Sequence, residues 1–416
     1  MISLERLEAA FAHMKTITAP GNGIHRLAFS DADWAGRQYL IDLMKDAGLT
    51  IRIDAFGNVI GHYTGTNEDL PAIMCGSHGD SVPEGGNYDG VFGILTAIET
   101  LRSMQEDHFR PDHPIEVVLF MCEESSRFGA ATLGSRAMRG ELSTKDLDTL
   151  KGKDGCSLRQ VLLSRGLDPD HLEKAVYTRP LKAFLETHIE QGRVLEHEGL
   201  TIGAVTGIAA PSRFKVHLHG SADHSGATPM ALRHDGLCAA ALVISKLEAL
   251  ASHASEPPVV GTVGICDVTP DVMNVIPGEV TLGIDIRSIF SAAKKQVADA
   301  LKAYIECICR ARDIPYTLEP VSDEMPAVMH PTMVRLVQKA AEKNGYPALA
   351  MPSGAGHDSM HWASYCPTGM IFIPCKNGIS HNPAEYASPE DNYAGAKVFS
   401  ELIRTLSQKD FEHDRL

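Results

Sequence analysis

Histidine and glutamate side chains recur at the ends of strongly apolar runs in this chain. The polar ends are His78 after PAIMCGS, Glu123 and Glu124 after VVLFMC, His188 and Glu190 in KAFLETHIEQG, and His381 and Glu385 after IFIPCKNGIS. Such runs are typical of buried strands, and the carboxyl ends of parallel strands meet at one edge of a sheet. Imidazoles and carboxylates gathered there are the ligand set for zinc or a similar divalent ion.

The adjacent pair Glu123 and Glu124 strengthens this interpretation. The pair directly follows the apolar run VVLFMC, so at least one carboxylate stands where burial begins. Two adjacent carboxylates repel each other there, and the arrangement is costly unless a cation or a shared proton offsets the charge. The joint occurrence at four strand ends therefore favours a metal centre over solvated surface side chains.

A glycine-rich loop, SHGDSVPEGGNYDGVFG at 77–93, follows the first of these strand ends. Its glycines let the chain leave a buried strand, fold back and enter a helix. Asp80 stands two residues after His78 and is well placed to accept the second imidazole N–H, which would fix the tautomer of a ligand histidine. We therefore expect Asp80 to support His78 rather than to bind a metal itself.

Helical and strand-like runs alternate through the first part of the chain. A helical pattern at 34–48 precedes strand-like runs at 49–63 and 71–78, then a helix at 93–104 and an apolar run at 114–124. Strands that alternate with helices and are apolar on both faces indicate an α/β fold with a mainly parallel sheet.

The pattern changes at about residue 209. The order that follows is β-α-β-β-α-β, which describes a small open-faced sandwich, and the alternating α/β pattern resumes with a helix at 331–345. We therefore predict a larger domain of residues 1–209 and 327–416, interrupted by an inserted domain of residues 210–326.

Composition limits the classes of partner. The 416 residues are 44% hydrophobic and 22% charged, with a formal net charge of -15, which argues against a nucleic acid or an anionic membrane as partner. The nine cysteines are odd in number and mostly lie in apolar runs, as expected of reduced thiols. The N-terminus lacks the features of a signal peptide, and no run approaches the roughly 20 apolar residues of a membrane span. A cytoplasmic protein is predicted.

Seven motifs resemble those of a known family. They are HGDSVPEGGNYDG, EESSRFG, HIEQGRVLE, HSGATPM, NVIPGEVTLGIDIRS, SGAGHDS and ISHNPAE, in this order. They resemble the M20 metallopeptidase-like amidohydrolases, in the branch of N-carbamoyl-L-amino acid hydrolases, β-ureidopropionases and allantoate amidohydrolases. The resemblance implies a catalytic domain with an inserted ferredoxin-like dimerisation domain, and two metal ions bridged by an aspartate.

The resemblance also implies a role for each metal ligand. His78 and His188 would bind one ion, Glu124 and His381 would bind the other, and Asp89 would bridge the two. Two ions about 3.5–4 Å apart can share one water and lower its pKa. Zinc, manganese, cobalt and nickel all suit this ligand set.

Catalytic and substrate-binding residues follow from the same resemblance. Glu123 would be the general base that takes a proton from water and passes it to the leaving nitrogen, after which the carbamate decomposes to carbon dioxide and ammonia. His224 would come from the partner subunit of a homodimer and polarise the reacting carbonyl. The remaining candidates bind the substrate: Asn274 and Arg287 would hold its carboxylate, and Gln191, Gly356 and His357 would line its pocket.

Several alternatives stay open at this level. The first hypothesis is hydrolysis of a small ureido acid: an N-carbamoyl α-amino acid, 3-ureidopropionate, allantoate or ureidoglycolate. The second is an aminoacylase or dipeptidase of the same fold, and the third is a non-catalytic metal-dependent binding protein. Gly79, where relatives often carry an apolar residue, and the segment 210–213 depart from the family pattern, and the latter leaves the side-chain pocket undefined.

Overall fold

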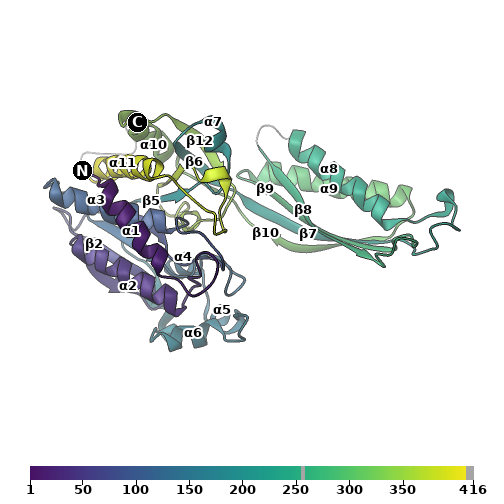
Figure 1. Cartoon of the computed structure of the whole chain (residues 1–416), viewed down its shortest axis with the longest axis horizontal. Helices are drawn as coiled ribbons and strands as arrows, with labels where there is room; N and C mark the ends of the chain where they lie inside the picture. The colour runs from purple at the N-terminus through teal and green to yellow at the C-terminus, as the bar shows by residue number, and fades with distance from the viewer. Residues whose placement is uncertain (254–257, 409–416) are drawn as a thin grey trace. The chain divides into compact units, whose positions relative to one another are not determined.

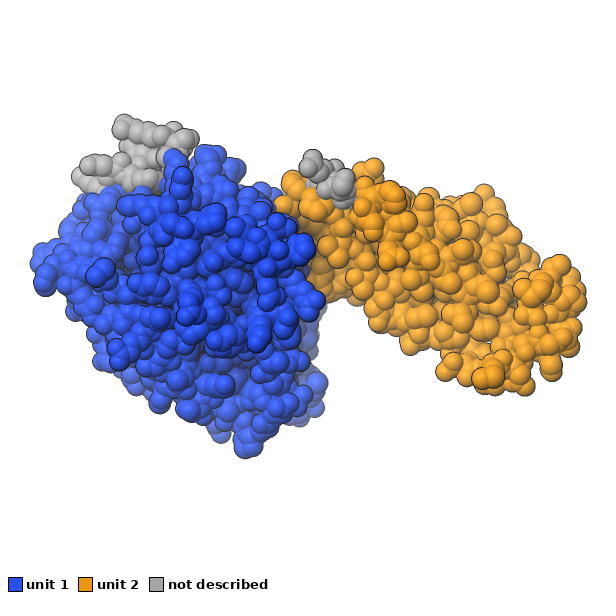
Figure 2. All heavy atoms as spheres, turned by 45° about the horizontal axis from the view of Figure 1, so that its top comes forward, with its two compact units in different colours: residues 1–206, 328–416 blue, residues 207–327 orange. Residues whose placement is uncertain are grey.

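The computed structural model describes residues 1–253 and 258–408. The chain divides into two compact units, one of residues 1–206 and 328–416 and the other of residues 207–327 (Figure 1, Figure 2). The smaller unit spans residues 207–327, and the sequence predicts an inserted domain of residues 210–326. Each unit has a hydrophobic core of its own.

A mixed sheet forms the centre of the larger unit. Its order is β1-β2-β4-β3-β5-β13-β6-β11, and β12 also pairs with β6. The strands are β1 Thr50–Ile53, β2 Val59–Tyr63, β3 Ala72–His78, β4 Ile115–Phe120, β5 Leu181–Ile189, β6 Ile202–Ile208, β11 Ala327–Val328, β12 Ala348–Ser353 and β13 Thr368–Ile373. The four central strands, β4, β3, β5 and β13, are parallel to one another. The predicted α/β fold with a mostly parallel sheet is confirmed.

Burial explains why these strands are apolar on both faces. Every residue of β3, β4 and β13 is buried, because helices and loops cover both sides of the sheet. The helices of this unit are α1 Leu4–Thr16, α2 Asp31–Asp46, α3 Val91–Glu106, α4 Leu133–Met138, α5 Thr144–Thr149, α6 Leu158–Ser164, α7 Val194–Glu198, α10 Pro331–Lys343 and α11 Pro389–Leu406, with 3₁₀ helices η1 Pro169–Ala175, η3 Asp358–His361 and η4 Lys376–Gly378. α3 begins at Val91, within the last residues of the glycine-rich stretch 77–93, and packs against β3.

The single strand-like run at 49–63 folds as two antiparallel strands. β1 and β2 pair with each other, and a turn at Asp54–Asn58 separates them. The buried Asp54 carboxylate accepts the backbone N–H groups of Phe56, Gly57 and Asn58 at 2.9, 2.8 and 2.9 Å. These three bonds satisfy the turn's backbone donors, so the run is interrupted although its flanks are apolar.

The smaller unit is an antiparallel sheet with two helices on one face. Its strand order is β10-β7-β9-β8, and its elements in chain order are β7 Ala210–His219, the 3₁₀ helix η2 Met230–Leu232, α8 Gly236–His253, β8 Val260–Thr269, β9 Glu279–Ser288, α9 Ser291–Ala311 and β10 Tyr316–Asp323. Its main elements follow the expected order β-α-β-β-α-β. Phe214, Val216 and Leu218 alternate along β7 toward the helices and form part of the core.

One helix of the described residues, α8, is long and apolar enough to cross a membrane by length and composition alone. It lies in the middle of the chain, and Ala239, Ala240, Val243 and Leu247 on one of its faces are buried in the core of the smaller unit. Its apolar composition is therefore partly explained by packing on the sheet.

Candidate metal centre

The five residues expected to bind metal gather at the carboxyl edge of the larger sheet. Their ligand atoms form two groups, each with all its atoms within 4.8 Å of one another: His78, Asp89 and His188 in one, and Asp89, Glu124 and His381 in the other. His78 is the last residue of β3, and His188 is the second-last residue of β5. The topology brings the set together because parallel strands end at the same edge.

Asp89 belongs to both groups through different oxygens. Its Oδ1 lies 3.2 Å from His78 Nε2 and 3.1 Å from His188 Nε2. Its Oδ2 lies 3.2 Å from His381 Nε2, which in turn lies 3.2 Å from Glu124 Oε1. Ligand atoms about 2.0–2.1 Å from a tetrahedral ion are separated by about 3.3 Å, so these spacings suit two ions that share one carboxylate.

Burial and charge make this cluster a site for cations. His78, His188, Asp89 and Glu124 are buried, whereas the His381 side chain is 49% exposed. Burial opposes ionisation of Asp89, but the adjacent imidazoles of His188, His381 and His78 hold the pKa of its carboxyl well below its usual value. Hydrogen bonds to Asp89 and Glu124 raise the pKa of His381 to about 11. The carboxylates thus stabilise positive charge strongly at this edge.

Two glycines bring the loop and its ligands together. Gly90 has φ +66°, and a Cβ at this position would lie 2.5 Å from the His78 ring. A Cβ on Gly86 would lie 2.1 Å from the Glu385 carboxyl group. The loop can therefore pack against the His78 ring and the Glu385 carboxyl group only because Gly86 and Gly90 lack a side chain.

Glu385 fixes the segment that carries Asp89. Its Oε1 accepts the backbone N–H groups of Tyr88 at 2.9 Å and Asp89 at 3.1 Å, and its Oε2 accepts the Ser380 hydroxyl at 2.7 Å. Sequence reasoning placed Glu385 near the candidate site but assigned it no role. The contact spans almost 300 positions, so no local pattern could reveal it.

Asp80 supports the site in a different way from that expected. His78 Nδ1 lies 3.0 Å from the backbone carbonyl oxygen of Asp80, whereas the Asp80 carboxylate is 3.6 Å away. The carboxylate instead accepts the backbone N–H groups of Glu123 at 3.2 Å and Glu124 at 3.1 Å. The backbone of Asp80 thus orients the histidine, and its side chain holds the glutamate pair.

The side chains of Glu123 and Glu124 diverge. Glu123 Oε2 lies 3.8 Å from His78 Nε2, while Glu124 Oε1 points to His381. Burial, reinforced by the charge of Glu124, raises the pKa of the Glu123 carboxyl well above its usual value although His78 opposes the shift. A buried carboxyl of raised pKa beside a cation site can accept and return a proton.

Gln191 and His357 both contact candidate ligands. Gln191 Nε2 donates to Asp89 Oδ2 at 2.8 Å. The His357 ring packs edge-on against His188 with a centroid separation of 4.5 Å, and burial and His188 lower its pKa well below the usual value. Gly356, by contrast, has open space where a Cβ would stand and needs no left-handed backbone. The structure gives no steric reason for glycine at that position.

A buried glutamate that sequence reasoning missed joins two ligand strands. Glu186 lies on β5 two residues before His188, and its carboxylate accepts the Ser77 hydroxyl at 2.7 Å and the Ser359 N–H and hydroxyl at 3.0 and 2.6 Å. Ser77 immediately precedes His78. The available signal was a charged residue in the apolar run KAFLETHI, on the same strand face as His188.

The other three candidate residues lie in the smaller unit. His224 and Asn274 are exposed and adjacent, since the N–H of Ser225 donates to the Asn274 carbonyl at 3.1 Å. His224 Nδ1 accepts the N–H groups of Gly226 and Ala227, both at 3.1 Å, which leaves the proton on Nε2.

Arg287 is distant from that pair. It lies near the end of β9, where its Nε and Nη2 donate to the Asp285 carboxylate at 2.9 and 3.0 Å. Asn274 precedes the start of the same strand at Glu279. Eight strand positions span roughly 26 Å, so the structure does not bring Arg287 together with His224 and Asn274 within one unit.

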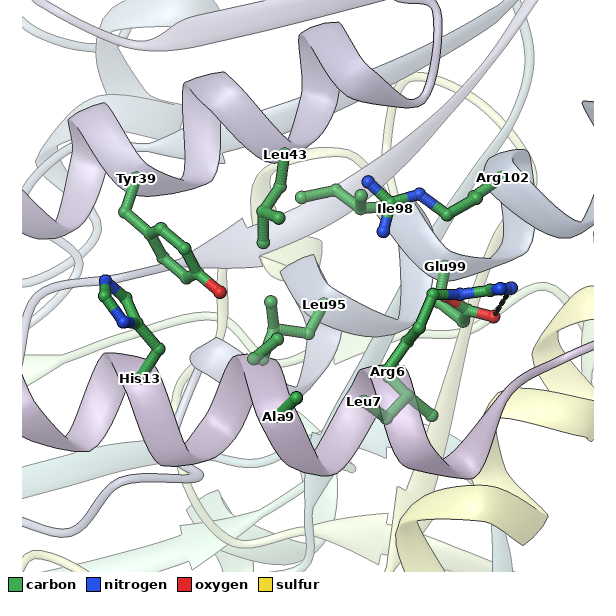
Figure 3. A pocket seen from close by; sticks show the side chains of 11 residues that line it. Arg6, Leu7, Ala9, His13, Tyr39, Leu43, Leu95, Ile98, Glu99 and Arg102 are labelled. Carbon is green, nitrogen blue, oxygen red and sulfur yellow. Dashed lines mark hydrogen bonds and ion pairs between the residues drawn. The ribbon is translucent and has the colours of Figure 1, made fainter.

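A cavity of about 320 Å³ lies elsewhere in the larger unit, between α1, α2 and α3 (Figure 3). Its apolar lining includes Leu7, Leu43 and Leu95, and two of its charged residues pair with each other, with Arg6 Nη2 2.7 Å from Glu99 Oε1. None of the predicted site residues lines it. This cavity is separate from the metal centre.

Comparison with known proteins agrees with the fold. The family model for peptidase family M20/M25/M40 matches residues 74–405, and the chain belongs to this family. The family is metal-dependent, and the two ligand groups are the candidate sites for its ions.

Individual relatives are similar over most of their length. An N-carbamoyl-L-amino acid amidohydrolase of Geobacillus stearothermophilus is 39% identical over 98% of this chain and 100% of its own. A ureidoglycolate hydrolase of Arabidopsis thaliana is 38% identical over 94% of this chain and 83% of its own. The crystal structure of a hydantoinase/carbamoylase family amidase from Burkholderia multivorans matches with a TM-score of 0.92 and 35% identity, over 99% of both chains.

Proposed function

We propose that this protein hydrolyses the C–N bond of a linear ureido acid, such as an N-carbamoyl-L-amino acid or allantoate, and releases ammonia and carbon dioxide. The observation that carries this proposal is Asp89, whose two oxygens face two separate ligand groups with Glu123 beside them. The relatives' names support ureido acids as the substrate class.

Two divalent ions fit the donor set. Three imidazoles and two carboxylates offer nitrogen and oxygen ligands, which suit zinc and also manganese, cobalt or nickel. When bound, the ions would polarise the scissile carbonyl and lower the pKa of a water between them. His78 and His188 would hold one ion, Glu124 and His381 the other, and Asp89 both.

Glu123 is the general base in this proposal. It follows a buried strand, lies beside His78, and is directed away from the ligand position of Glu124. Its carboxylate takes a proton from the attacking water and delivers it to the leaving nitrogen, so that the amine departs neutral. The carbamic acid that remains decomposes to carbon dioxide and ammonia.

The polar residues of the smaller unit provide substrate recognition. Arg287 is held by Asp285 with its guanidinium oriented, and an arginine fork suits a substrate carboxylate, with Asn274 as a second donor. His224 carries its proton on Nε2, so it can donate to a carbonyl oxygen that gains negative charge. In the larger unit, Gln191 and His357 border the ligands on the substrate side.

A homodimer would reconcile the positions of these residues. Arg287 and the pair of His224 and Asn274 are separated by roughly 26 Å along the smaller unit, much more than the length of a small ureido acid. One copy therefore cannot present all three to a single substrate, whereas two copies can each supply part of the set.

The exposed edge of the smaller unit supports such a dimer. Among the described residues β8 pairs with β9 alone, so its other edge has unpaired backbone groups, and Val260 and Ile265 on it are exposed. Leu237 and Leu242 on α8 are exposed as well. A second copy that covered this edge would satisfy the strand and bury these side chains.

All nine cysteines are free, and five of them are buried. This pattern supports a reducing compartment such as the cytoplasm as the place where the enzyme works.

An ammonia-release assay tests the proposal. Enzyme stripped of metal and reconstituted with zinc, manganese, cobalt or nickel in turn is assayed with N-carbamoyl-L-amino acids, 3-ureidopropionate, allantoate and ureidoglycolate. N-acetyl amino acids and dipeptides serve as comparison substrates. Ammonia release from a ureido acid supports the proposal, whereas turnover of only the acetylated or dipeptide substrates would assign the chain to aminoacylase or dipeptidase activity.

A further inference from the structure

The segment that carries Glu123 is held at its backbone by the start of α4. The N–H of Thr132 donates to the Glu123 carbonyl at 2.7 Å, and the N–H of Leu133 donates to the Cys122 carbonyl at 3.0 Å. On the other side of the same segment, the Asp80 carboxylate accepts the N–H of Glu123. The peptide groups on both sides of Glu123 are thus clamped.

This clamp requires unusual backbone conformations. Cys122 has φ +59° and Thr132 has φ +55°, both in the left-handed region although neither is glycine. A β-branched residue such as threonine is especially disfavoured there. Surrounding contacts must therefore hold Thr132 in place, and such strain is concentrated where a functional group must be oriented.

A polar relay holds the Thr132 side chain. Its hydroxyl lies 2.8 Å from His361 Nε2, and His361 Nδ1 lies 2.5 Å from Glu141 Oε2. Since the carboxylate of Glu141 can only accept, Nδ1 carries a proton, and Nε2 shares a hydrogen bond with the Thr132 hydroxyl. Thr132 is only 5% exposed, so water cannot readily replace this partner.

A second bond joins the same two elements. The Ser135 hydroxyl donates to Asp358 Oδ1 at 2.6 Å, and Asp358 begins the 3₁₀ helix η3 that ends at His361. α4 is therefore attached to η3 at two points, one turn of helix apart. Thr132, His361 and Glu141 are arranged like a catalytic triad of nucleophile, base and acid. However, Thr132 is buried, and its backbone N–H is hydrogen-bonded to the Glu123 carbonyl.

We propose that Thr132, through its bond to His361, is a positioning residue for Glu123. The inference rests on the proposed function, in which Glu123 is the general base. Loss of the hydroxyl would release the side chain of Thr132, let α4 shift relative to η3, and misplace the Glu123 carbonyl and with it the carboxyl group. A small displacement of a proton-transfer group slows the chemical step more than it weakens substrate binding.

The test compares Thr132→Val, Thr132→Ser and Thr100→Val in the full-length, metal-loaded enzyme. Valine keeps the β-branch and the shape but lacks the hydroxyl, and serine keeps the hydroxyl. Thr100 is a matched control, because its hydroxyl is buried on α3 without a partner among the described residues. The kcat and KM on the best ureido substrate, the metal content and the melting temperature are measured.

We expect Thr132→Val to lower kcat roughly 10- to 100-fold with KM and metal content nearly unchanged, and Thr132→Ser to restore most of the rate. Thr100→Val should behave like the unmodified enzyme. An unchanged kcat in Thr132→Val would overturn the inference, and so would a loss of metal that accounts for the lost rate.

Glu123→Gln, assayed in parallel, separates this inference from the proposed function. If Glu123→Gln retains activity, Glu123 is not the base, and both the mechanism and the inference fail. If Glu123→Gln is inactive while Thr132→Val is fully active, the mechanism stands and the positioning role alone is wrong.

Discussion

The carboxyl edge of the larger sheet and strand β9 of the smaller unit distribute their functional residues in opposite ways. At the sheet edge, five candidate ligands from separate segments form two groups that share Asp89, and the ligand atoms within each group lie within 4.8 Å of one another. Along β9, residues close in sequence are far apart, with Asn274 before its start and Arg287 near its end. Parallel strands collect their ends at one edge, whereas an extended antiparallel strand separates its two ends by its full length. Under the proposed function, the first region would complete a metal site alone, and the second would need another copy of the chain.

Substitution within the glutamate pair gives the largest expected effect and tests whether the sheet edge is complete by itself. Glu123→Gln should lower kcat by about 10³-fold while both ions remain bound, because the amide cannot accept the proton. Glu124→Gln should lose metal together with activity, because Glu124 reaches His381 at the second ligand group. Metal analysis and ammonia release on the two variants check this. Loss of metal in Glu123→Gln would make that residue a ligand instead.

Mixing two inactive variants tests whether one active site takes His224 from one copy of the chain and Arg287 from the other. His224→Ala and Arg287→Ala should each lose about 10²-fold or more in kcat/KM. When the two are unfolded, mixed equally and refolded, roughly a quarter of the sites should combine intact His224 with intact Arg287. Recovery of activity near that level, measured against each variant refolded alone, supports shared sites. No recovery, with dimers present by sedimentation, would show that one copy supplies both residues.

Substitution of two glycines in the same loop gives the smallest expected effects. It tests whether the sheet edge needs a glycine only where a Cβ would meet the His78 ring. Gly90→Ala places a Cβ against the His78 ring at a left-handed position, so we expect metal affinity to fall by about 10-fold and the free energy of unfolding by about 1 kcal/mol. Gly79→Ala brings a Cβ only to 3.2 Å from Leu119 Cδ1, with no left-handed strain. Its effect should stay within about 0.5 kcal/mol. Metal titration and thermal melting compare the pair, and equal losses would contradict the steric argument.

Local sequence patterns were sufficient to predict the strands and helices, but they were insufficient to predict the hydrogen bonds that support the site. Apolar runs of strand length, ended by histidine or glutamate, predicted the parallel sheet and drew attention to its edge. The run at 49–63 was harder, because the bonds of the Asp54 carboxylate close a turn inside an apolar stretch. Local spacing was also insufficient for Asp80. Its position two residues after His78 suggested a side-chain contact with that ring, but its carboxylate accepts the N–H groups of Glu123 and Glu124 instead.

The sequence by itself determined the residue types at the sheet edge, the order of the motifs and the inserted β-α-β-β-α-β segment. These features follow from short-range periodicity and from side-chain chemistry, which the residue type alone determines. Only the tertiary structure decided that Glu385 fixes the Asp89 loop, that Glu186 joins β5 to Ser77, and that His361 holds Thr132. Each of those bonds joins residues about a hundred or more positions apart, so its partner depends on how the chain folds rather than on its local pattern.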